Sequence, residues 1–378
     1  MKKSSFMLLC AALCLLMLAA LPFLCAHGSM LPEKTTEYYQ QKARMDAETA
    51  TGAEAELMAL LLGGGAPQQE EAEPSPAPAL SFHAFGLWIA LGGALMEAAL
   101  FLFAWKEKAL QKALVWTALL ALPLGLLGGR LVYCLTEISL YLVYLNAPLA
   151  MLNIWDGGLS VMGALVFMEL AGVLGAKLGK AQKGKVLDAL VFFFPLFLLF
   201  GVCPAQMAAG TCYGPEIPFS LPLLTAEMDG AIYLNTAFLT PLVIGLSFLL
   251  LHRLAPKGLP AGRLFLYAAF LYGCLMVLME SLRRDGHMQW GFVHAEMLYA
   301  MVIALPAGLV LAEKKRRLAL LGATALLAGA VIGLEFMLDR SNIHNGLLYL
   351  VYIICLAAYI FIGLKWAKRA CEPAKNNV

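Results

Sequence analysis

The chain contains few charged residues: Asp, Glu, Lys and Arg make up 14% of its 378 residues, whereas hydrophobic residues make up 61%. A soluble domain of this length needs a larger share of polar residues to cover its surface. The composition therefore excludes an ordinary soluble protein. The net charge of +2 gives no support for nucleic-acid binding, because the basic residues are spread through short segments.

Metal-binding patterns are also lacking. The nine cysteines form no Cys-x-x-Cys pair and show no Cys/His spacing typical of zinc ligands, so we expect neither a metal nor another cofactor. Most cysteines lie in apolar runs and are interpreted as small hydrophobic residues. Cys203 and Cys212 flank an outer segment where a disulfide is permitted, but their spacing does not establish one. No internal repeat supports an inverted-repeat transporter.

Long apolar segments, in contrast, are abundant. A bilayer is crossed by a helix of about 20 apolar residues. Segments of roughly this kind lie at 6–26, 83–105, 113–144, 158–177, 187–204, 234–252, 264–282, 296–312, 319–338 and 346–365. We therefore expect an all-α polytopic membrane protein.

The two ends of the chain differ from its middle. Residues 28–81 are polar and acidic and end in "QQEEAEPSPAPA", which is typical of a flexible linker without a core. The segment before it suits either a cleaved signal sequence or a retained anchor. We expect five parts: a signal sequence or anchor helix (1–27), the linker (28–81), a seven-helix core (82–313), two additional helices (314–366) and a tail (367–378).

The distribution of Lys and Arg predicts the orientation. Most of them fall in alternate connections, which include 106–112, 177–185, 253–263, 314–317 and the C-terminal 365–375. The positive-inside rule assigns these connections to the cytoplasm. The acidic linker is then outside and the C-terminus cytoplasmic.

Three stretches place polar residues at membrane depth or at its outer edge. "GLLGGRLVYCLTE" puts Arg130, Tyr133 and Glu137 on one helix face. A charge at this depth is costly and usually faces the protein interior or a wet cavity. Arg130 therefore suits an anionic headgroup, but equally a pair with Glu137 or a side chain that reaches the interface.

The second stretch, "NIWDGGLS", precedes an apolar segment. Its charge and its two glycines suit a tight turn in which Asp156 or Ser160 caps a helix, with Trp155 at the membrane interface. Taken alone, these residues favour a structural turn.

The third stretch, "LYGCLMVLMESLRRDG", carries Glu280, Arg283 and Arg284 near the outer end of a segment. Their spacing permits an ion pair on one helix face. A basic pair on the outer side runs against the positive-inside trend, which favours a phosphate site instead.

Together these stretches resemble the prolipoprotein diacylglyceryl transferases of bacterial membranes. The family's Gly-(Gly/Ala)-Arg with a Tyr three residues later matches Gly128, Gly129, Arg130 and Tyr133; its Trp-(Asp/Glu)-Gly-Gly-x-Ser-x-His-Gly matches Trp155, Asp156, Gly157, Gly158, Ser160 and Gly163; its Tyr-Gly-x-x-Arg-x-x-x-Glu-x-x-Arg matches Tyr272, Gly273, Glu280 and Arg283. The family's signature loop aligns with 201–214 and ends near Gly214.

The resemblance implies a reaction in which a lipobox cysteine of a prolipoprotein takes the diacylglyceryl group of phosphatidylglycerol. It implies Asp156 and Arg130 as catalytic residues, and a lipid or phosphate site formed by Arg130, Tyr133, Glu280, Arg283 and Arg284. Thiol attack needs a base, and the departing phosphate needs cations. The implied partners are phosphatidylglycerol or another anionic lipid and a prolipoprotein, in the bacterial cell membrane.

The departures from the family fall on its chemical groups. The motif His is Met162, the Arg after Tyr-Gly is Met276, and the signature-loop Arg is Val202. In addition, Ala205 stands where the family has an Asn, Thr211 stands at or near the position of a family Glu, and Phe85 stands where the family has a Tyr. We therefore expect either a divergent transferase, with Asp156 or His83 as a replacement base, or a non-catalytic relative that binds anionic lipid or lipoprotein precursor. A transporter of the same shape is a third, less supported hypothesis.

Overall fold

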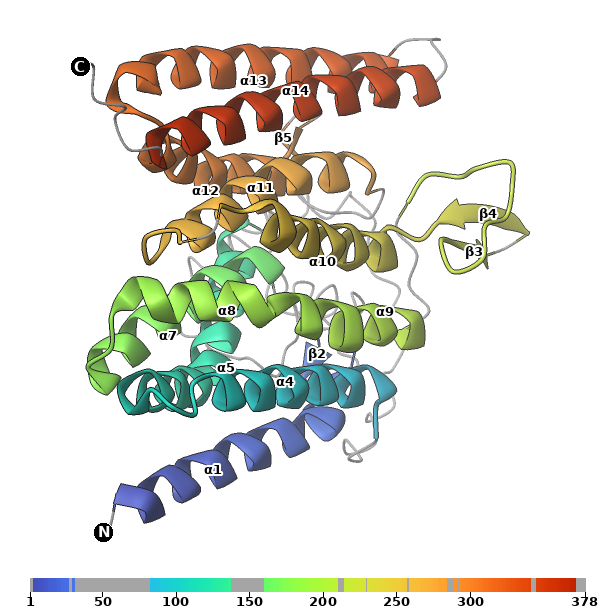
Figure 1. Ribbon diagram of the computed structural model, residues 1–378. Helices are drawn as coiled ribbons and strands as arrows, with labels where there is room; N and C mark the ends of the chain where they lie inside the picture. Colours follow the sequence, from blue (N-terminus) through green and yellow to red (C-terminus); the bar gives the residue numbers. More distant parts are fainter. Residues whose placement is uncertain are drawn as a thin grey trace, which may run out of the picture.

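A computed structural model describes residues 3–26, 29–30, 82–136, 160–209, 214–228, 230–256, 258–283, 289–290, 293–340 and 345–371. In the described residues each expected apolar segment lies mainly on a helix, which confirms the all-α membrane fold (Figure 1). The helices are α1 (Lys3–Leu24), α4 (Ala84–Phe103), α5 (Lys108–Thr136), α7 (Val161–Gly179), α8 (Lys183–Phe197), α9 (Cys203–Ala209), α10 (Thr236–Leu254), α11 (Arg263–Ser281), α12 (Ala295–Leu311), α13 (Arg317–Arg340) and α14 (Asn345–Cys371). Most of the expected linker and tail lies outside the described residues.

The long helices form a stack that follows the order of the chain. Figure 1 shows α1 at one edge and α13 with α14 at the opposite edge, with α4, α8, α10, α11 and α12 between them. The pairs α5 with α7, α11 with α12 and α13 with α14 pack closely. Both chain ends lie at the same end of the stack.

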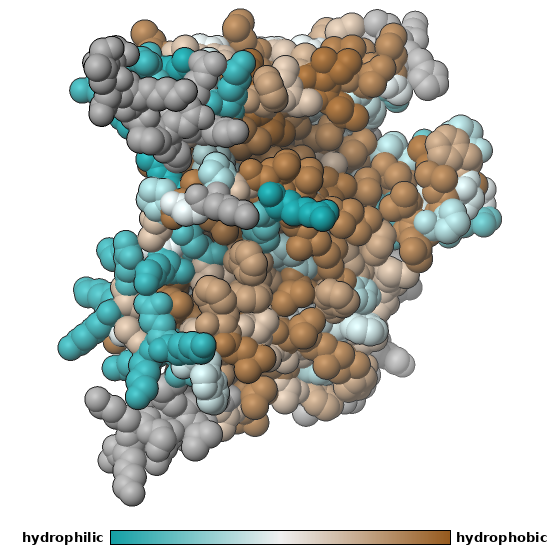
Figure 2. All heavy atoms as spheres, viewed as in Figure 1, coloured by the Kyte–Doolittle hydropathy of each residue, from teal (hydrophilic) through white to brown (hydrophobic). Residues whose placement is uncertain are grey.

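Eight of the described helices are long and apolar enough to cross a membrane. Figure 2 shows hydrophobic residues across the middle of the molecule and hydrophilic residues gathered at the end that holds the chain termini. The Lys and Arg residues expected in the cytoplasm lie at that end, in the turns between α4 and α5, α7 and α8, α10 and α11, and α12 and α13. The exposed apolar faces between the two ends suit contact with lipid tails.

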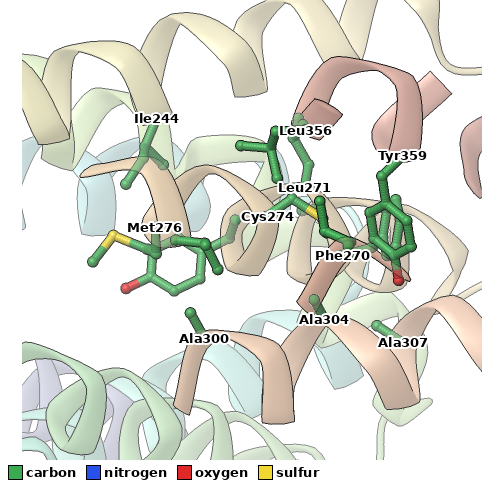
Figure 3. Close-up of a cluster of buried hydrophobic side chains, with 14 of the residues drawn as sticks. Ile244, Phe270, Leu271, Cys274, Met276, Ala300, Ala304, Ala307, Leu356 and Tyr359 are labelled. Atoms are coloured by element: carbon green, nitrogen blue, oxygen red, sulfur yellow. The ribbon is translucent and has the colours of Figure 1, made fainter. Parts of the chain in front are cut away.

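Helix α11 is the most enclosed of the candidate spans in the described part of the chain. Within its membrane window 67% of the residues are buried, against 39% or less for the others. Figure 3 shows its Phe270, Leu271 and Cys274 between Leu356 and Tyr359 of α14 on one side and Ala300, Ala304 and Ala307 of α12 on the other. A side chain on α11 is therefore held by neighbours on several sides.

A short π-helical segment, η3 (Leu198–Val202), joins α8 to α9 just after Pro195. Proline removes a backbone donor, and single π turns often mark functional positions in helices. Here η3 passes α4 at a glycine contact, because a Cβ on Gly92 would overlap the backbone of Gly201. The signature-loop alignment begins in this segment.

The strands are short, and one pair of them lies outside the stack. β3 (Thr225–Met228) and β4 (Ala231–Leu234) form an antiparallel hairpin that projects beyond the end opposite the termini (Figure 1). Two further two-stranded pairs join β1 (Cys25–Ala26) to β2 (Ser29–Met30) and β5 (Gln289–Trp290) to β6 (Val293–His294), and a 3-10 turn, η4 (Lys314–Arg316), precedes α13.

Candidate functional site

Backbone contact between α5 and α7 explains the glycines of the first two motifs. A Cβ on Gly163 of α7 would overlap the carbonyl oxygen of Gly128 on α5, and a Cβ on Gly128 would overlap Phe167. Small residues allow membrane helices to approach this closely. The contact therefore brings the part of α5 that carries Arg130 close to the part of α7 that carries Met162.

Ser160 joins the start of α7 to the Arg130 motif. Its backbone nitrogen donates to the carbonyl oxygen of Gly129 at 3.0 Å, and its Oγ accepts a bond from the Gly163 nitrogen at 3.3 Å. The side-chain bond confirms that Ser160 caps the helix. The end of the Trp-Asp-Gly-Gly motif is thus tied directly to the residue before Arg130.

Arg130 is fully buried on α5, with 0% of its surface exposed. Its guanidinium carbon lies 5.9 Å from the centroid of the Tyr133 ring, a cation–π distance. The expected shared face of Arg130 and Tyr133 is confirmed. Glu137, its suggested partner, lies outside the described residues.

Tyr272 of α11 contacts the residue that replaces the family's histidine. Its hydroxyl donates to the Met162 sulfur at 3.4 Å, and both residues are at most 8% exposed. A thioether accepts hydrogen bonds weakly and takes no proton at neutral pH. The next residue, Gly273, allows α12 to approach, because a Cβ there would overlap the Ala300 carbonyl oxygen.

One face of α11 leads from this contact to the C-terminal end of the helix. Tyr272, Met276 and Glu280 follow one another at intervals of one helical turn. Met276, which replaces the family's arginine after Tyr-Gly, is 5% exposed. It lies one turn from Tyr272 on one side and one turn from Glu280 on the other. A methionine there supplies packing but no charge.

Arg283 binds two carboxylates rather than standing alone. Its Nη1 donates to Glu280 Oε1 at 3.2 Å and to Glu296 Oε2 at 3.1 Å. Glu280 is 1% exposed, and the side chains of Arg283 and Glu296 are 20% and 16% exposed. The ion pair suggested by the spacing is confirmed. In this arrangement two carboxyl groups bind the same guanidinium of Arg283.

The signature segment retains little of its polar character in the described residues. Val202 ends η3, and Ala205 in α9 is 0% exposed. Cys203 is a free, buried thiol that points to the Phe238 carbonyl oxygen at 4.0 Å. Gly214 lies against β4, where a Cβ would overlap the Leu234 carbonyl oxygen.

Several expected site residues lie outside the described residues. They are Trp155, Asp156, Gly157, Gly158, Thr211, Cys212 and Arg284. His83 precedes α4, and its backbone nitrogen donates to the Pro22 carbonyl oxygen of α1 at 2.7 Å. Phe85 lies in the first turn of the same helix, so the structure places both residues on the α1 side of the stack.

Sequence reasoning missed two acidic residues of the site. Glu296, in the first turn of α12, completes the clamp on Arg283. Glu169 of α7 lies two turns along from Met162, on the same helix face, and within electrostatic range of Tyr272. A carboxylate inside an apolar segment is an available signal for Glu169, because such residues usually mark function. The pairing of Arg283 with Glu296 depends on how α12 packs beside α11, and no pattern within one helix predicts that packing.

The candidate site combines the buried guanidinium of Arg130, the ion-paired guanidinium of Arg283 and the phenol of Tyr272. Guanidinium groups form strong hydrogen bonds to phosphate, and Arg130 and Arg283 are the two guanidinium groups of this arrangement. The described residues contain no group of three His, Cys, Asp or Glu that could hold a metal ion. Nothing at the position of Met162 accepts a proton.

A model of the family described as prolipoprotein diacylglyceryl transferase matches residues 76–312. The chain belongs to this family. Two curated relatives from Streptococcus pyogenes, of serotype M3 (strain ATCC BAA-595 / MGAS315) and serotype M5 (strain Manfredo), are named phosphatidylglycerol–prolipoprotein diacylglyceryl transferase. They are 26% and 25% identical over 218 residues, which cover 53% of this chain and 77% of each relative. Together with the apolar helices, this makes the chain a multi-pass bacterial membrane protein.

Proposed function

We propose that this member of the transferase family holds an anionic phospholipid of the phosphatidylglycerol class at Arg130 and does not transfer its diacylglyceryl group by the family's ordinary route. The observation that carries the proposal is the contact between the Tyr272 hydroxyl and the Met162 sulfur at 3.4 Å. A thiol nucleophile needs a nearby base to take its proton, and a thioether is no base. The site keeps Arg130 and Arg283 for binding a headgroup, whereas position 162 has lost the group that would accept the proton.

Lipid binding follows from the buried cations. A guanidinium forms strong, two-pronged hydrogen bonds to phosphate. Arg130 is fully buried beside the Ser160 cap, and Arg283 stands at the outer end of α11. Because Glu280 and Glu296 compete for Arg283, the headgroup relies first on Arg130. In family members with arginines at the positions of Val202 and Met276, the headgroup has two further cations to bind.

Transfer of the diacylglyceryl group to the lipobox cysteine of a prolipoprotein is the second candidate, since the relatives carry this activity in their names. The retention of Arg130, Glu280 and Arg283 favours it. It requires another base, for which Asp156, His83 and Glu169 are the candidates. A bound prolipoprotein is a partner in both cases.

The orientation in the membrane belongs to the same proposal. The basic end of the stack is assigned to the cytoplasm, with the acidic linker outside and the C-terminal tail inside. The proposal includes the five parts of the chain expected from the sequence, with the seven-helix core at 82–313. In this orientation Arg283 and Glu296 lie near the outer surface, and Arg130 lies deeper along α5.

Native mass spectrometry of the protein in detergent tests the binding proposal. Phosphatidylglycerol is added in steps, and Arg130→Ala is expected to lower its apparent affinity about 10-fold or more, as for loss of a charged hydrogen bond. Arg340→Ala removes a largely exposed arginine at the outer end of α13 and serves as the matched control. Equal binding by Arg130→Ala and the wild type would overturn the proposal.

A further inference from the structure

The last two helices, α13 and α14, lie beyond the residues that the family model matches, which end at 312. They are packed on each other and on the core: α14 contacts α11 and α12, and α13 contacts α12. Their contacts with α11 include polar ones near its outer end. The function proposed above leaves these contacts without a role.

Tyr349 of α14 caps the end of α11. Its hydroxyl donates to the carbonyl oxygen of Ser281 at 2.9 Å, and Ser281 is the last residue of α11. The final carbonyls of a helix have no partner within the helix and are normally satisfied by water or by another group. Here a side chain of an additional helix supplies the bond.

Tyr352, one turn further along α14, binds the same end of α11. Its hydroxyl donates to the Val277 carbonyl oxygen at 3.4 Å, and Tyr352 is 1% exposed. Glu335 of α13, 4% exposed, and Ser281, 0% exposed, lie within hydrogen-bonding reach of this hydroxyl. Buried polar residues in membrane helices are costly and usually functional. This cluster joins α13, α14 and α11 directly behind the candidate site.

The position of the cluster suggests its purpose. Ser281 is adjacent to Glu280 and two residues before Arg283, so the carbonyl held by Tyr349 belongs to the turn that carries the ion pair. We propose that α13 and α14 form a positioning unit for the lipid site: Tyr349 and Tyr352 fix the outer end of α11 and thereby the direction of Arg283. The inference rests on the proposed binding of phospholipid and extends it to helices outside the matched core.

The middle of α14 provides the matched control. The hydroxyl of Tyr359 lies 2.7 Å from Thr324 Oγ1 of α13, so it joins the two additional helices to each other rather than to the backbone of α11. Tyr359→Phe therefore removes the same atom from the same helix. If α13 and α14 only add bulk to the stack, Tyr349→Phe and Tyr359→Phe behave alike.

Two measurements on the full-length protein in detergent test the inference. Hydrogen exchange of the backbone amides at 278–283 is expected to rise in Tyr349→Phe and Tyr352→Phe but not in Tyr359→Phe. Phosphatidylglycerol affinity, followed by native mass spectrometry, is expected to fall about 3- to 10-fold in Tyr349→Phe, the range for one hydrogen bond. Phenylalanine keeps the ring packing, so the fold is preserved.

A double-mutant cycle with Arg283→Gln separates positioning from general stability. The Tyr349→Phe effect on affinity is expected to disappear in the Arg283→Gln background, because Tyr349 acts through Arg283. A full effect in that background, or equal exchange at 278–283 in Tyr349→Phe and Tyr359→Phe, would overturn the inference. Phosphatidylglycerol binding insensitive to Arg130→Ala would instead overturn the function on which it rests, whatever the exchange result.

Discussion

The two walls of the candidate site differ in what they retain. On the α5–α7 wall, Gly128 and Gly163 meet at the helix crossing, Ser160 caps α7, and Arg130 is buried beside them. On the α11 wall, Tyr272, Gly273, Glu280 and Arg283 remain, but Met276 replaces a charged residue and Arg283 is bound by two carboxylates. The close backbone contacts are preserved on both walls, whereas each wall has lost a chemical group, the motif histidine at Met162 on α7 and an arginine at Met276 on α11.

The difference separates two kinds of constraint. A glycine at a backbone crossing cannot be exchanged without moving two helices, so it persists as long as the fold does. A histidine or arginine that acts only on a substrate can be replaced by methionine or valine of suitable volume at little structural cost. The pattern fits a chain that still needs the scaffold and no longer needs the whole reaction.

The largest effect is expected where the first wall is broken. Gly163→Leu would drive a side chain into the Gly128 carbonyl and Val132, so we expect no folded protein, or a loss well above the roughly 1–3 kcal/mol of ordinary overpacking. The measurement is thermal unfolding in detergent. Gly329→Leu on α13, where a Cβ meets nothing within 4 Å, is expected to leave Tm nearly unchanged. Similar Tm values for the two variants would contradict this account of the wall.

A gain of binding is expected on the second wall. Glu296→Gln replaces one of the two carboxyl groups that bind Arg283 with a neutral amide, so the affinity for phosphatidylglycerol should rise about 3- to 10-fold. Native mass spectrometry measures the change. Glu313→Gln, which weakens ion pairs with Lys315 and Arg316 at the opposite end of the stack, should leave the affinity unchanged. A fall in affinity in Glu296→Gln would show that Glu296 supports the headgroup instead.

The smallest effect is expected at the helix cap. Ser160→Ala removes the bond to the Gly163 nitrogen, whose length of 3.3 Å is long, and should cost about 0.5–1 kcal/mol. Thermal unfolding should show a correspondingly small drop in Tm, with Ser247→Ala in the middle of α10 as the control for loss of a hydroxyl. A large drop would mean that the Ser160 side chain also holds Arg130 in place.

Local patterns were sufficient for the helices but not for choosing among the contacts within one helix. The apolar segments follow from the sequence, whereas spacing gave the Ser160 cap and the Glu280–Arg283 pair only as alternatives to an Asp156 cap and a phosphate site. The contact of Met162 with Tyr272 joins residues 110 positions apart, and it depends on how α7 and α11 meet across the stack. The capping of Ser281 by Tyr349 is equally non-local, since the two lie 68 positions apart. The packing of the helices determines such contacts, and they cannot be predicted from the sequence of either helix alone.

We propose that the site binds lipid but lacks the proton acceptor for transfer. The most direct test incubates the purified protein with phosphatidylglycerol and a lipobox peptide and follows the intact mass of the peptide, beside a Streptococcus pyogenes relative as a positive control. We expect the relative to add one diacylglyceryl group and this chain to add none while it still binds the lipid. A diacylglyceryl mass gain with the wild type that is lost in Arg130→Ala would contradict the claim and identify an active transferase.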